Sequence, residues 1–410
     1  MQNDLAIIKA LKLGRVPMHG TLELAVGRDA EIAEFQRVID FICAGGADVR
    51  FLRGDYSAGK TFMCGVLRKL AFDRSLGVSI INLSREIPFG RRETVLTQIL
   101  QGLRTVTSGP ESAMNEIVEQ WFERFDPGTS LEENEPLRNA IHGVSVSDAQ
   151  LASALRGYYR AYCDGDGELM EGALAFMRGE VIVPQARSAL KLAGRMTPDN
   201  AFRRLRAFLA LARDAGYPGL LILIDEAETI QRLNKSQRDA AYTAIREIID
   251  SCETGFPHCL FVFAGTQELF EKEYRGIASY QPLYQRIKNT QASSVRDLRQ
   301  PIIRLEELDR DALITVSRRV RAIHGRAYGW EAQLALPDRL IDALITNVAA
   351  RFGEVRIKPR GFLKALVDAL DAKQQGLDGP TVDDAVRSIE AVELNDTRLD
   401  GDDDVIVAVA

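Results

Sequence analysis

The stretch "VRFLRGDYSAGKTFMCGVLRKLA", residues 49–71, runs from an apolar segment through a glycine-bounded loop into an amphipathic helix. Its centre, "GDYSAGKT" at 54–61, has the G-x-x-x-x-G-K-T pattern of a P-loop. A helix N-terminus has free backbone N–H groups and a partial positive charge, so it suits an anion. We expect a strand over 49–53, a helix over 60–72 and a phosphate site between them; an ordinary glycine turn is the alternative.

The residue types in this loop fit a nucleoside triphosphate and its metal ion. Gly54 and Gly59 allow a tight turn and a close approach to phosphate oxygens. Lys60 would meet the β- and γ-phosphates, and the Thr61 hydroxyl would bind Mg²⁺, a hard cation that prefers oxygen ligands. The predicted cofactors are therefore ATP and Mg²⁺, with the nucleotide held by Gly54, Asp55, Tyr56, Ser57, Ala58, Gly59, Lys60, Thr61 and Phe62.

The whole chain has the composition of a soluble globular protein. Its 410 residues, 46% of them hydrophobic, are enough for two or more domains. The N-terminus lacks a signal-peptide pattern and no run of about 18 apolar residues occurs, so we expect a cytoplasmic protein without a membrane partner. The five cysteines form no C-x-x-C pair and are expected to be reduced and buried. A net charge of −6 argues against a surface that binds nucleic acid everywhere, although a local patch stays open.

A second nucleotide signature is the apolar run Leu220–Ile224, which ends in Asp225 and Glu226. A parallel strand that ends in an acid delivers a carboxylate to the sheet edge where ligands bind. Asp225 would hold Mg²⁺ through water, and Glu226 would act as the general base on the attacking water. The alternative is a plain strand end with a capping acid.

A third strand is expected over Cys259–Ala264. A polar residue at its tip would contact the γ-phosphate or the attacking water; Thr266 is the first candidate and Gln267 the second. Alternatively, either residue only caps the helix that begins near Glu268.

The layout of the chain predicts an interrupted nucleotide-binding core. Residues 88–219 show helical periodicity and no convincing strand, which indicates a mainly helical insertion of unassigned chemistry. From about 301 onward the pattern predicts four short helices that form a small bundle. The expected division is 1–87 (first part of the core), 88–200 (insertion), 201–300 (second part of the core), 301–392 (helical lid) and 393–410 (acidic tail).

The last third also carries two features that point to partners. The tail joins an acidic run to an apolar segment, so it is either a partner-docking strand or disordered. Basic residues cluster before it and would bind DNA non-specifically through phosphates, unless they form a solvated face or a protein-binding surface. They are Arg318, Arg319, Arg321, Arg326, Arg351, Arg356 and Lys358.

These motifs, in this order, resemble those of the AAA+ ATPases, and within them the origin-recognition and Cdc6-like group, whose N-terminal box is similar to "VGRDAEI" at 26–32. The flanking words "LLILIDEAETIQRL", "FVFAGTQELF" and "KPRGFLKALVDAL", with the long insertion, are similar to the ATP-binding proteins of bacterial BREX phage-defence loci. The resemblance covers about 27–390. It implies an α/β AAA+ P-loop fold with a parallel sheet, and an accessory ATPase in anti-phage defence that works beside a helicase or another defence-system protein.

The resemblance also implies roles for residues outside the two signatures. Val26 and Gly27 would line the adenine pocket, and Arg28 would close its edge. Arg360, at the start of a lid helix, would reach the γ-phosphate; alternatively it is a surface arginine.

A further arginine would act on the nucleotide of a neighbouring copy, which implies self-association in ATP. Arg286 is preferred over Arg275 for this role. The chain has threonine or glutamine at the third strand's tip where an asparagine is usual, so a nucleotide-gated switch with little turnover stays open beside an active ATPase. A small-molecule kinase is disfavoured, because the pair Asp225 and Glu226 fits water activation.

Overall fold

The computed structural model describes residues 2–56, 58–109, 112–126, 128–288, 297–352 and 358–377, without the side chains of residues 253 and 350–352. The chain forms two compact units. The sheet unit comprises the described residues of 33–53 and 70–304. The lid unit comprises the described residues of 2–32, 54–69 and 305–377.

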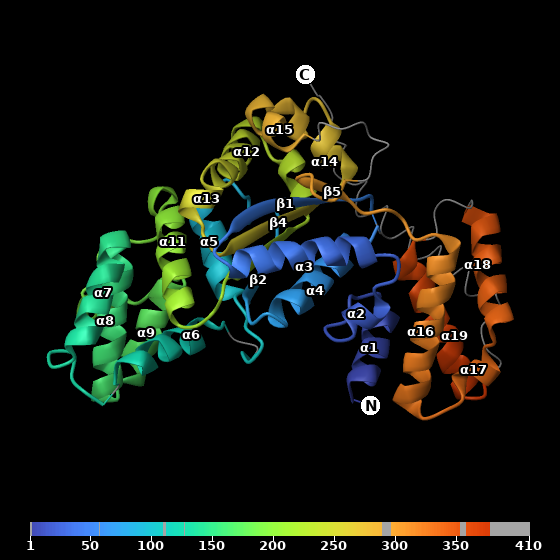
Figure 1. Ribbon diagram of the computed structural model, residues 1–410, viewed down its shortest axis with the longest axis horizontal. Helices are drawn as coiled ribbons and strands as arrows, with labels where there is room; N and C mark the ends of the chain where they lie inside the picture. Colours follow the sequence, from blue (N-terminus) through green and yellow to red (C-terminus); the bar gives the residue numbers. More distant parts are fainter. Residues whose placement is uncertain are drawn as a thin grey trace, which may run out of the picture. The chain divides into compact units, whose positions relative to one another are not determined.

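The sheet unit is built on a five-stranded sheet with the order β2-β3-β4-β1-β5, in which every pairing is parallel (Figure 1). All residues of β3 and β4 are buried, which explains why both read as continuous apolar runs. The α/β fold with a parallel sheet predicted from the sequence is confirmed. The strands are β1 (Ala47–Arg53), β2 (Gly77–Asn82), β3 (Leu220–Asp225), β4 (Cys259–Gly265) and β5 (Ile302–Arg304).

The expectation of helices alone after residue 301 is wrong at β5. This strand has only three residues and pairs with the end of β1, Phe51 with Ile302 and Arg53 with Arg304. Three residues are too few to show the alternation or the apolar run that marks a strand in sequence. The strand forms because the edge of β1 offers it hydrogen-bond partners, as in Phe51 N–H to Pro301 O at 2.9 Å.

Helices pack around the sheet and extend from it. The helix expected over 60–72 is observed as α4 (Lys60–Phe72), and α3 (Asp29–Cys43) precedes β1 in the chain. In Figure 1, α12 and α15 lie together over one face of the sheet. The helices that follow β3 and β4 are α12 (Lys235–Asp250), α13 (Cys252–Gly255), α14 (Gln267–Glu271) and α15 (Gln281–Ile287), with the 3₁₀ turns η2 (Ala227–Arg232) and η3 (Ile277–Ser279).

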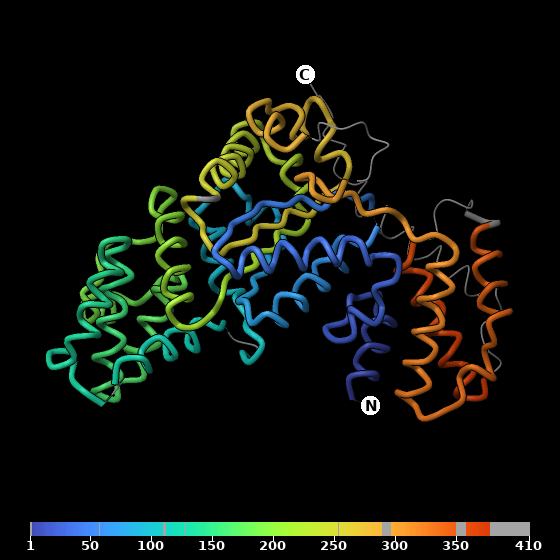
Figure 2. Tube along the Cα trace, viewed as in Figure 1, coloured from blue at the N-terminus to red at the C-terminus, as the bar shows by residue number. Residues whose placement is uncertain are grey.

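The interval between β2 and β3 is helical, as expected, and no strand occurs in its described residues. Figure 2 shows the chain run from β2 into this helical group before it returns to the sheet. Its core includes stacked aromatic rings, such as Phe122 and Tyr158 at 5.6 Å between centroids. The helices are α5 (Arg92–Gln101), α6 (Met114–Phe122), α7 (Glu135–Ser147), α8 (Ala149–Asp164), α9 (Gly167–Met177), α10 (Pro184–Ala189) and α11 (Pro198–Asp214), with the 3₁₀ turn η1 (Glu123–Phe125).

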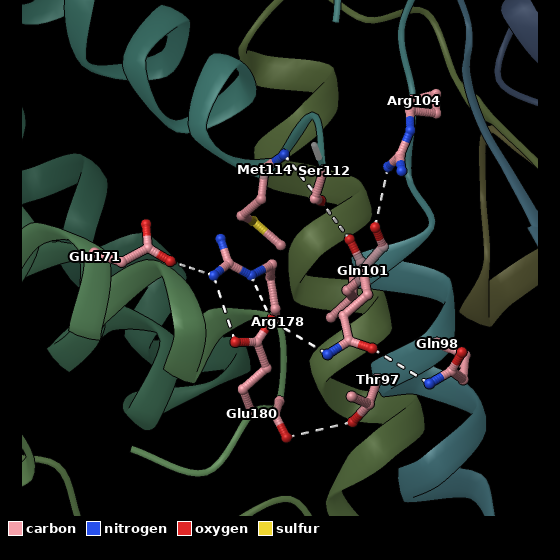
Figure 3. A network of polar contacts seen from close by, with 11 residues as sticks. Thr97, Gln98, Gln101, Arg104, Ser112, Met114, Glu171, Arg178 and Glu180 are labelled. Atoms are coloured by element: carbon pink, nitrogen blue, oxygen red, sulfur yellow. Dashed lines mark hydrogen bonds and ion pairs between the residues drawn. The ribbon is translucent and has the colours of Figure 1, made fainter. Parts of the chain in front are cut away.

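A polar network joins the end of α9 to α5 (Figure 3). Arg178 donates to Glu180 at 2.7 Å and pairs with Glu171, while the Gln101 amide donates to the same Glu180 carboxylate at 3.2 Å. The Thr97 hydroxyl, on α5, hydrogen-bonds to a main-chain carbonyl in the turn after α9. Within the insertion, the network therefore holds the end of α9 to α5, the helix that packs on β2.

The lid unit has its own hydrophobic core. Three of the four expected lid helices are observed, as α16, α18 and α19, whereas the fourth, at 381–393, and the acidic tail lie outside the described residues. An N-terminal helix, α1, packs on α16 and α19 and was not expected. The helices are α1 (Gln2–Lys12), α2 (Thr21–Leu24), α16 (Arg310–Tyr328), α17 (Ala332–Ala335), α18 (Asp338–Phe352) and α19 (Pro359–Gln374).

Cysteines and helix composition agree with most of the sequence expectations. None of the five cysteines forms a disulfide; Cys64, Cys252 and Cys259 are buried and Cys43 is half-buried. Cys163 is exposed, contrary to expectation, because it lies at the solvent-facing end of α8. None of the helices in the described part of the chain has the length and apolar character that crossing a bilayer requires.

Candidate nucleotide-binding site

The glycine-bounded loop begins directly after Arg53, the last residue of β1, and leads into α4. A Cβ on Gly54 would lie 2.9 Å from the Ala58 Cβ, so the loop closes too tightly for any other residue there. Gly59 has φ +90°, a backbone conformation that L side chains rarely adopt. The two glycines are thus needed for different reasons, close approach at Gly54 and backbone twist at Gly59.

The ammonium group of Lys60 is turned into the loop. Its Nζ donates to the carbonyls of Gly54 at 2.9 Å and Asp55 at 3.2 Å, and the residue is 8% exposed. The Tyr56 ring lies 5.3 Å from the same Nζ, at cation–π distance. A buried cation on two neutral carbonyls is suited to exchange them for phosphate oxygens, since charge-assisted hydrogen bonds are stronger.

The remaining residues of the predicted phosphate site divide into two groups. Thr61 is exposed in the first turn of α4, where a hydroxyl is accessible to a metal ion. Phe62 is half-buried and packs against the core of the lid unit, as does Val26. Ser57 lies outside the described residues.

Arg28 joins three segments of the lid unit. Its guanidinium donates to the carbonyl of Ala58 in the loop at 3.1 Å and to that of Glu306, and it pairs with Glu31 at 3.5 Å. Gly27, beside it, has φ +68° and therefore sets the turn before α3. The Arg28 side chain thus holds the backbone of the glycine-bounded loop.

Arg360, the predicted lid arginine, is exposed at the first turn of α19. Its Nε donates to the carbonyl of Gly14 at 2.6 Å. This bond ties α19 to the turn that follows α1.

The acid pair lies at the carboxyl edge of the sheet. Asp225 ends β3 and is buried, and its Oδ1 accepts a hydrogen bond from the Glu226 N–H at 2.9 Å. Glu226 is exposed and has φ +55°, a left-handed conformation that is uncommon for a residue other than glycine. Such strain concentrates at functional sites, where it aims a side chain.

The two candidates at the tip of β4 differ in their surroundings. Thr266 is 5% exposed and precedes α14, but its side chain makes no capping hydrogen bond. The Gln267 amide donates to Glu271 at 2.7 Å, along its own helix. Capping therefore does not explain Thr266, which keeps it the first candidate.

The two candidates for the arginine that acts in trans also differ. Arg286, on α15, pairs with Asp250 at the end of α12 through two nitrogens, with Nη2 to Oδ2 at 3.0 Å. Arg275 is exposed and its carbonyl accepts from the Tyr242 hydroxyl at 2.7 Å. The Arg286 side chain is thus held by an ion pair, whereas Arg275 contributes its main-chain carbonyl to a hydrogen bond.

Most arginines of the predicted DNA patch that the structure describes are engaged within the protein. Arg318 pairs with Asp338 at 2.9 Å, as does the buried Arg321, and Arg326 pairs with Asp4 at 2.8 Å. Arg319 donates to a main-chain carbonyl of α2 at 2.6 Å. Lys358 is half-buried, whereas the side chain of Arg351 and all of Arg356 lie outside the description.

Sequence reasoning missed the acids that hold these polar groups. Glu271 accepts from Gln267 and also pairs with Arg53, at 2.6 Å, next to the loop. Asp250 holds Arg286 from 36 positions away. Neither acid belongs to a motif, and their partners are set by tertiary packing, so no local pattern identifies them.

The sequence and the structure are each similar to known proteins. The family model for the BREX system ATP-binding protein BrxC/D matches residues 1–381. Two solved structures are similar to the chain: the Walker-type ATPase PABY2304 of Pyrococcus abyssi, with a TM-score of 0.44, 12% identity and coverage of 92% of this chain and 77% of that one, and the Aeropyrum pernix ORC2 protein in ADPNP–ADP complexes, with a TM-score of 0.44, 14% identity and coverage of 89% and 68%. No curated protein matches the chain in sequence.

Proposed function

The chain belongs to the BREX system ATP-binding BrxC/D family, and we propose that it is an ATPase that acts on a protein partner in anti-phage defence. The observation that carries the proposal is the buried Lys60, whose ammonium faces the carbonyls of a loop leading into a helix N-terminus. Family membership supports ATP as the ligand. ATP hydrolysis and the action on a protein partner are what we propose beyond it.

In this mechanism the loop binds the phosphates of ATP. The backbone N–H groups at the start of α4 and the Lys60 ammonium take the phosphate oxygens, and Arg28 keeps the loop in shape through the Ala58 carbonyl. Val26 and Gly27 line the adenine pocket, and Arg28, next to them in sequence, closes its edge.

The metal ion of the proposed site is Mg²⁺, for which the donor types fit. The Thr61 hydroxyl would hold the ion directly and the Asp225 carboxylate would hold it through water, and both groups offer the hard oxygen atoms that Mg²⁺ prefers. When bound, the ion neutralises charge on the phosphates. Glu226 accepts a proton from the attacking water, and its exposed position at the strand end leaves it accessible to solvent.

Three further residues complete the proposed site. Thr266 contacts the γ-phosphate or the attacking water through its hydroxyl, which makes no capping hydrogen bond to α14. Arg360 acts from the lid after it leaves the Gly14 carbonyl. Arg286 acts on the nucleotide of a second copy, so the active form is a self-associated one.

The proposed partner is a protein, such as a helicase or another component of the defence system. The ion pairs of Arg318, Arg321 and Arg326 neutralise much of the basic surface that DNA phosphates would need. Steady-state turnover with and without duplex DNA tests this choice. Stimulation by DNA that modest salt removes would favour DNA instead.

A nucleotide-gated switch with little turnover is the second candidate. The observation that favours it is the residue at the tip of β4, where threonine stands in place of the usual asparagine. Steady-state turnover of the wild type separates the two candidates.

Two variants test the site itself. Lys60→Ala is expected to weaken ATP binding about 10- to 100-fold, because it removes a charged hydrogen-bond donor to the phosphates. Glu226→Gln is expected to keep ATP affinity and lose about 100-fold or more in turnover, because the amide cannot take the proton. Calorimetry measures affinity and phosphate release measures turnover.

Lys69→Ala is the matched control, since it removes a lysine from the exposed end of the same helix. Unchanged ATP affinity in Lys60→Ala would exclude the phosphate site. Unchanged turnover in Glu226→Gln, beside an active wild type, would move the base to another residue.

A further inference from the structure

The side chain of Arg286 is oriented by contacts on two sides. Asp250 accepts from its Nε and Nη2, and the carbonyl of Pro282, one turn earlier on α15, accepts from Nη1 at 2.6 Å. Each terminal nitrogen keeps one further N–H, because a guanidinium has five donors in a fixed fork. The carboxylate thus fixes the Nε edge and leaves the opposite edge of the fork for another acceptor.

The pair is exposed to solvent, which decides between two possible roles for Asp250. The side chains of Arg286 and Asp250 are 37% and 41% exposed. Ion pairs at such positions contribute little free energy, because water screens both charges. A contact of that strength cannot keep an arginine from a triphosphate, which carries several negative charges, but it does restrict the rotamers of a long side chain.

Asp250 also has a defined place in the chain. It is the last residue of α12, a 16-residue helix that begins shortly after the acid pair of β3. A cavity of about 320 Å³ lies beside this ion pair. Its lining includes Asp250, Arg286 and the start of β1.

From this geometry we infer that Asp250 is a positioning residue, which orients Arg286 toward the nucleotide of a second copy of this chain. The inference rests on the proposed trans role of Arg286. The acid makes no contact with the nucleotide in this reaction; it lowers the entropy that Arg286 loses when it reaches the γ-phosphate.

The test uses Asp250→Ala in the full chain, with turnover measured over a range of protein concentrations. We expect turnover of the assembled form to fall about two- to fivefold, the scale of an exposed ion pair, with ATP affinity unchanged by calorimetry. In an Arg286→Ala background, the same substitution should have no further effect. A structural role for Asp250 would lower both measurements together with the unfolding midpoint.

A second readout is independent of turnover. In the Glu226→Gln background, sedimentation in ATP and Mg²⁺ measures self-association, which Asp250→Ala should weaken about two- to fivefold. Asp40→Ala is the matched control, because Asp40 holds Arg74 in a similarly exposed pair at 2.8 Å on α3 and should change neither readout.

The outcomes separate the inference from the proposed function. Arg286→Ala with wild-type turnover and association overturns the trans role, and the inference with it. A strong effect of Arg286→Ala beside a neutral Asp250→Ala overturns the positioning role alone. Faster turnover or tighter association in Asp250→Ala also overturns it, because the acid would then restrain the arginine.

Discussion

The helical insertion and the lid unit each bury a carboxylate, but the carboxylate pairs with an arginine in the first and with a histidine in the second. In the insertion, Arg204 donates to Asp148 at 2.6 Å, and the two side chains are 4% and 1% exposed. In the lid unit, Asp371 lies 3.0 Å from the Nε2 of the buried His324 and also pairs with Lys12. An arginine stays charged at all ordinary pH values, whereas a histidine does not. The ion pair of the insertion therefore keeps its charges at all ordinary pH values, whereas the histidine contact of the lid unit changes with pH.

The hydrogen bonds of His324 determine which ring nitrogen carries the proton when the ring is neutral. The Trp330 indole, which can only donate, donates to His324 Nδ1 at 2.9 Å. The proton of the neutral ring is therefore on Nε2, from which it is donated to Asp371. Burial lowers the pKa of His324, against the opposing effect of Asp371, while hydrogen bonds from Lys12 and His324 outweigh burial and lower the pKa of Asp371.

The largest effect is expected when the insertion's pair is broken. Asp148→Ala should lower the free energy of unfolding by about 3–5 kcal/mol, because it leaves the buried Arg204 charge without a partner. The same carboxylate also caps α8, where it accepts from the N–H groups of Gln150 and Leu151 at 2.9 Å. Denaturant unfolding followed by circular dichroism measures the change.

The double variant Asp148→Asn with Arg204→Met is the control, since it removes both charges and keeps a cap. We expect it to recover most of the lost stability. A loss below about 1 kcal/mol in Asp148→Ala would contradict a structural role for this pair.

A smaller effect, dependent on pH, is expected in the lid. The folded-state pKa of His324 is below its unfolded value of about 6.5, so the unfolded chain binds the proton more readily. Stability is full above that value and is lost as the pH falls toward the folded pKa, by about 1 kcal/mol per pH unit. Asp371, with its lowered pKa, loses its contribution only below about pH 4, outside this window.

Thermal unfolding between pH 7.5 and 5.5 measures this slope. His324→Gln keeps a polar side chain that does not titrate, and it should remove the His324 part of the slope. An identical slope in the wild type and this variant would show that the histidine does not set the pH dependence.

The smallest effect is expected at an exposed pair of the lid. Arg310 donates to Asp342 at 2.6 Å, with both side chains about half exposed. Arg310→Ala should cost less than about 1 kcal/mol, and the cost should disappear in 0.5 M salt, since the pair is screened. A loss of unfolding free energy that persists in salt would contradict the view that burial determines how much each ion pair contributes to stability.

Much of the fold follows from local patterns in the sequence. The helix α4 begins and ends at the expected residues, and β3 and β4 begin as expected and run one residue beyond their apolar runs, to Asp225 and Gly265. The short β5 was missed because its neighbour, not its composition, makes it a strand. The helix α1 was not expected, although its Ile7, Ile8 and Leu11 form a buried stripe.

The candidate site also has parts that the sequence predicts and parts that it does not. The phosphate loop and the acid pair are recognisable from sequence, because a few residues at fixed spacing make them. Their roles in the reaction stay predictions. The acids that hold other polar groups, Asp250 and Glu271, depend on contacts between separate elements, so their importance is visible only in three dimensions.

The order of the strands has a consequence for the protein as it is synthesised. The phosphate loop is complete at residue 61, but both neighbours of β1 in the sheet come much later, β4 from Cys259 and β5 from Ile302. The last helix of the insertion ends at Asp214, before either neighbour exists. A nascent chain therefore completes its insertion first, and its phosphate loop has no sheet to extend from until well over half of the chain has left the ribosome.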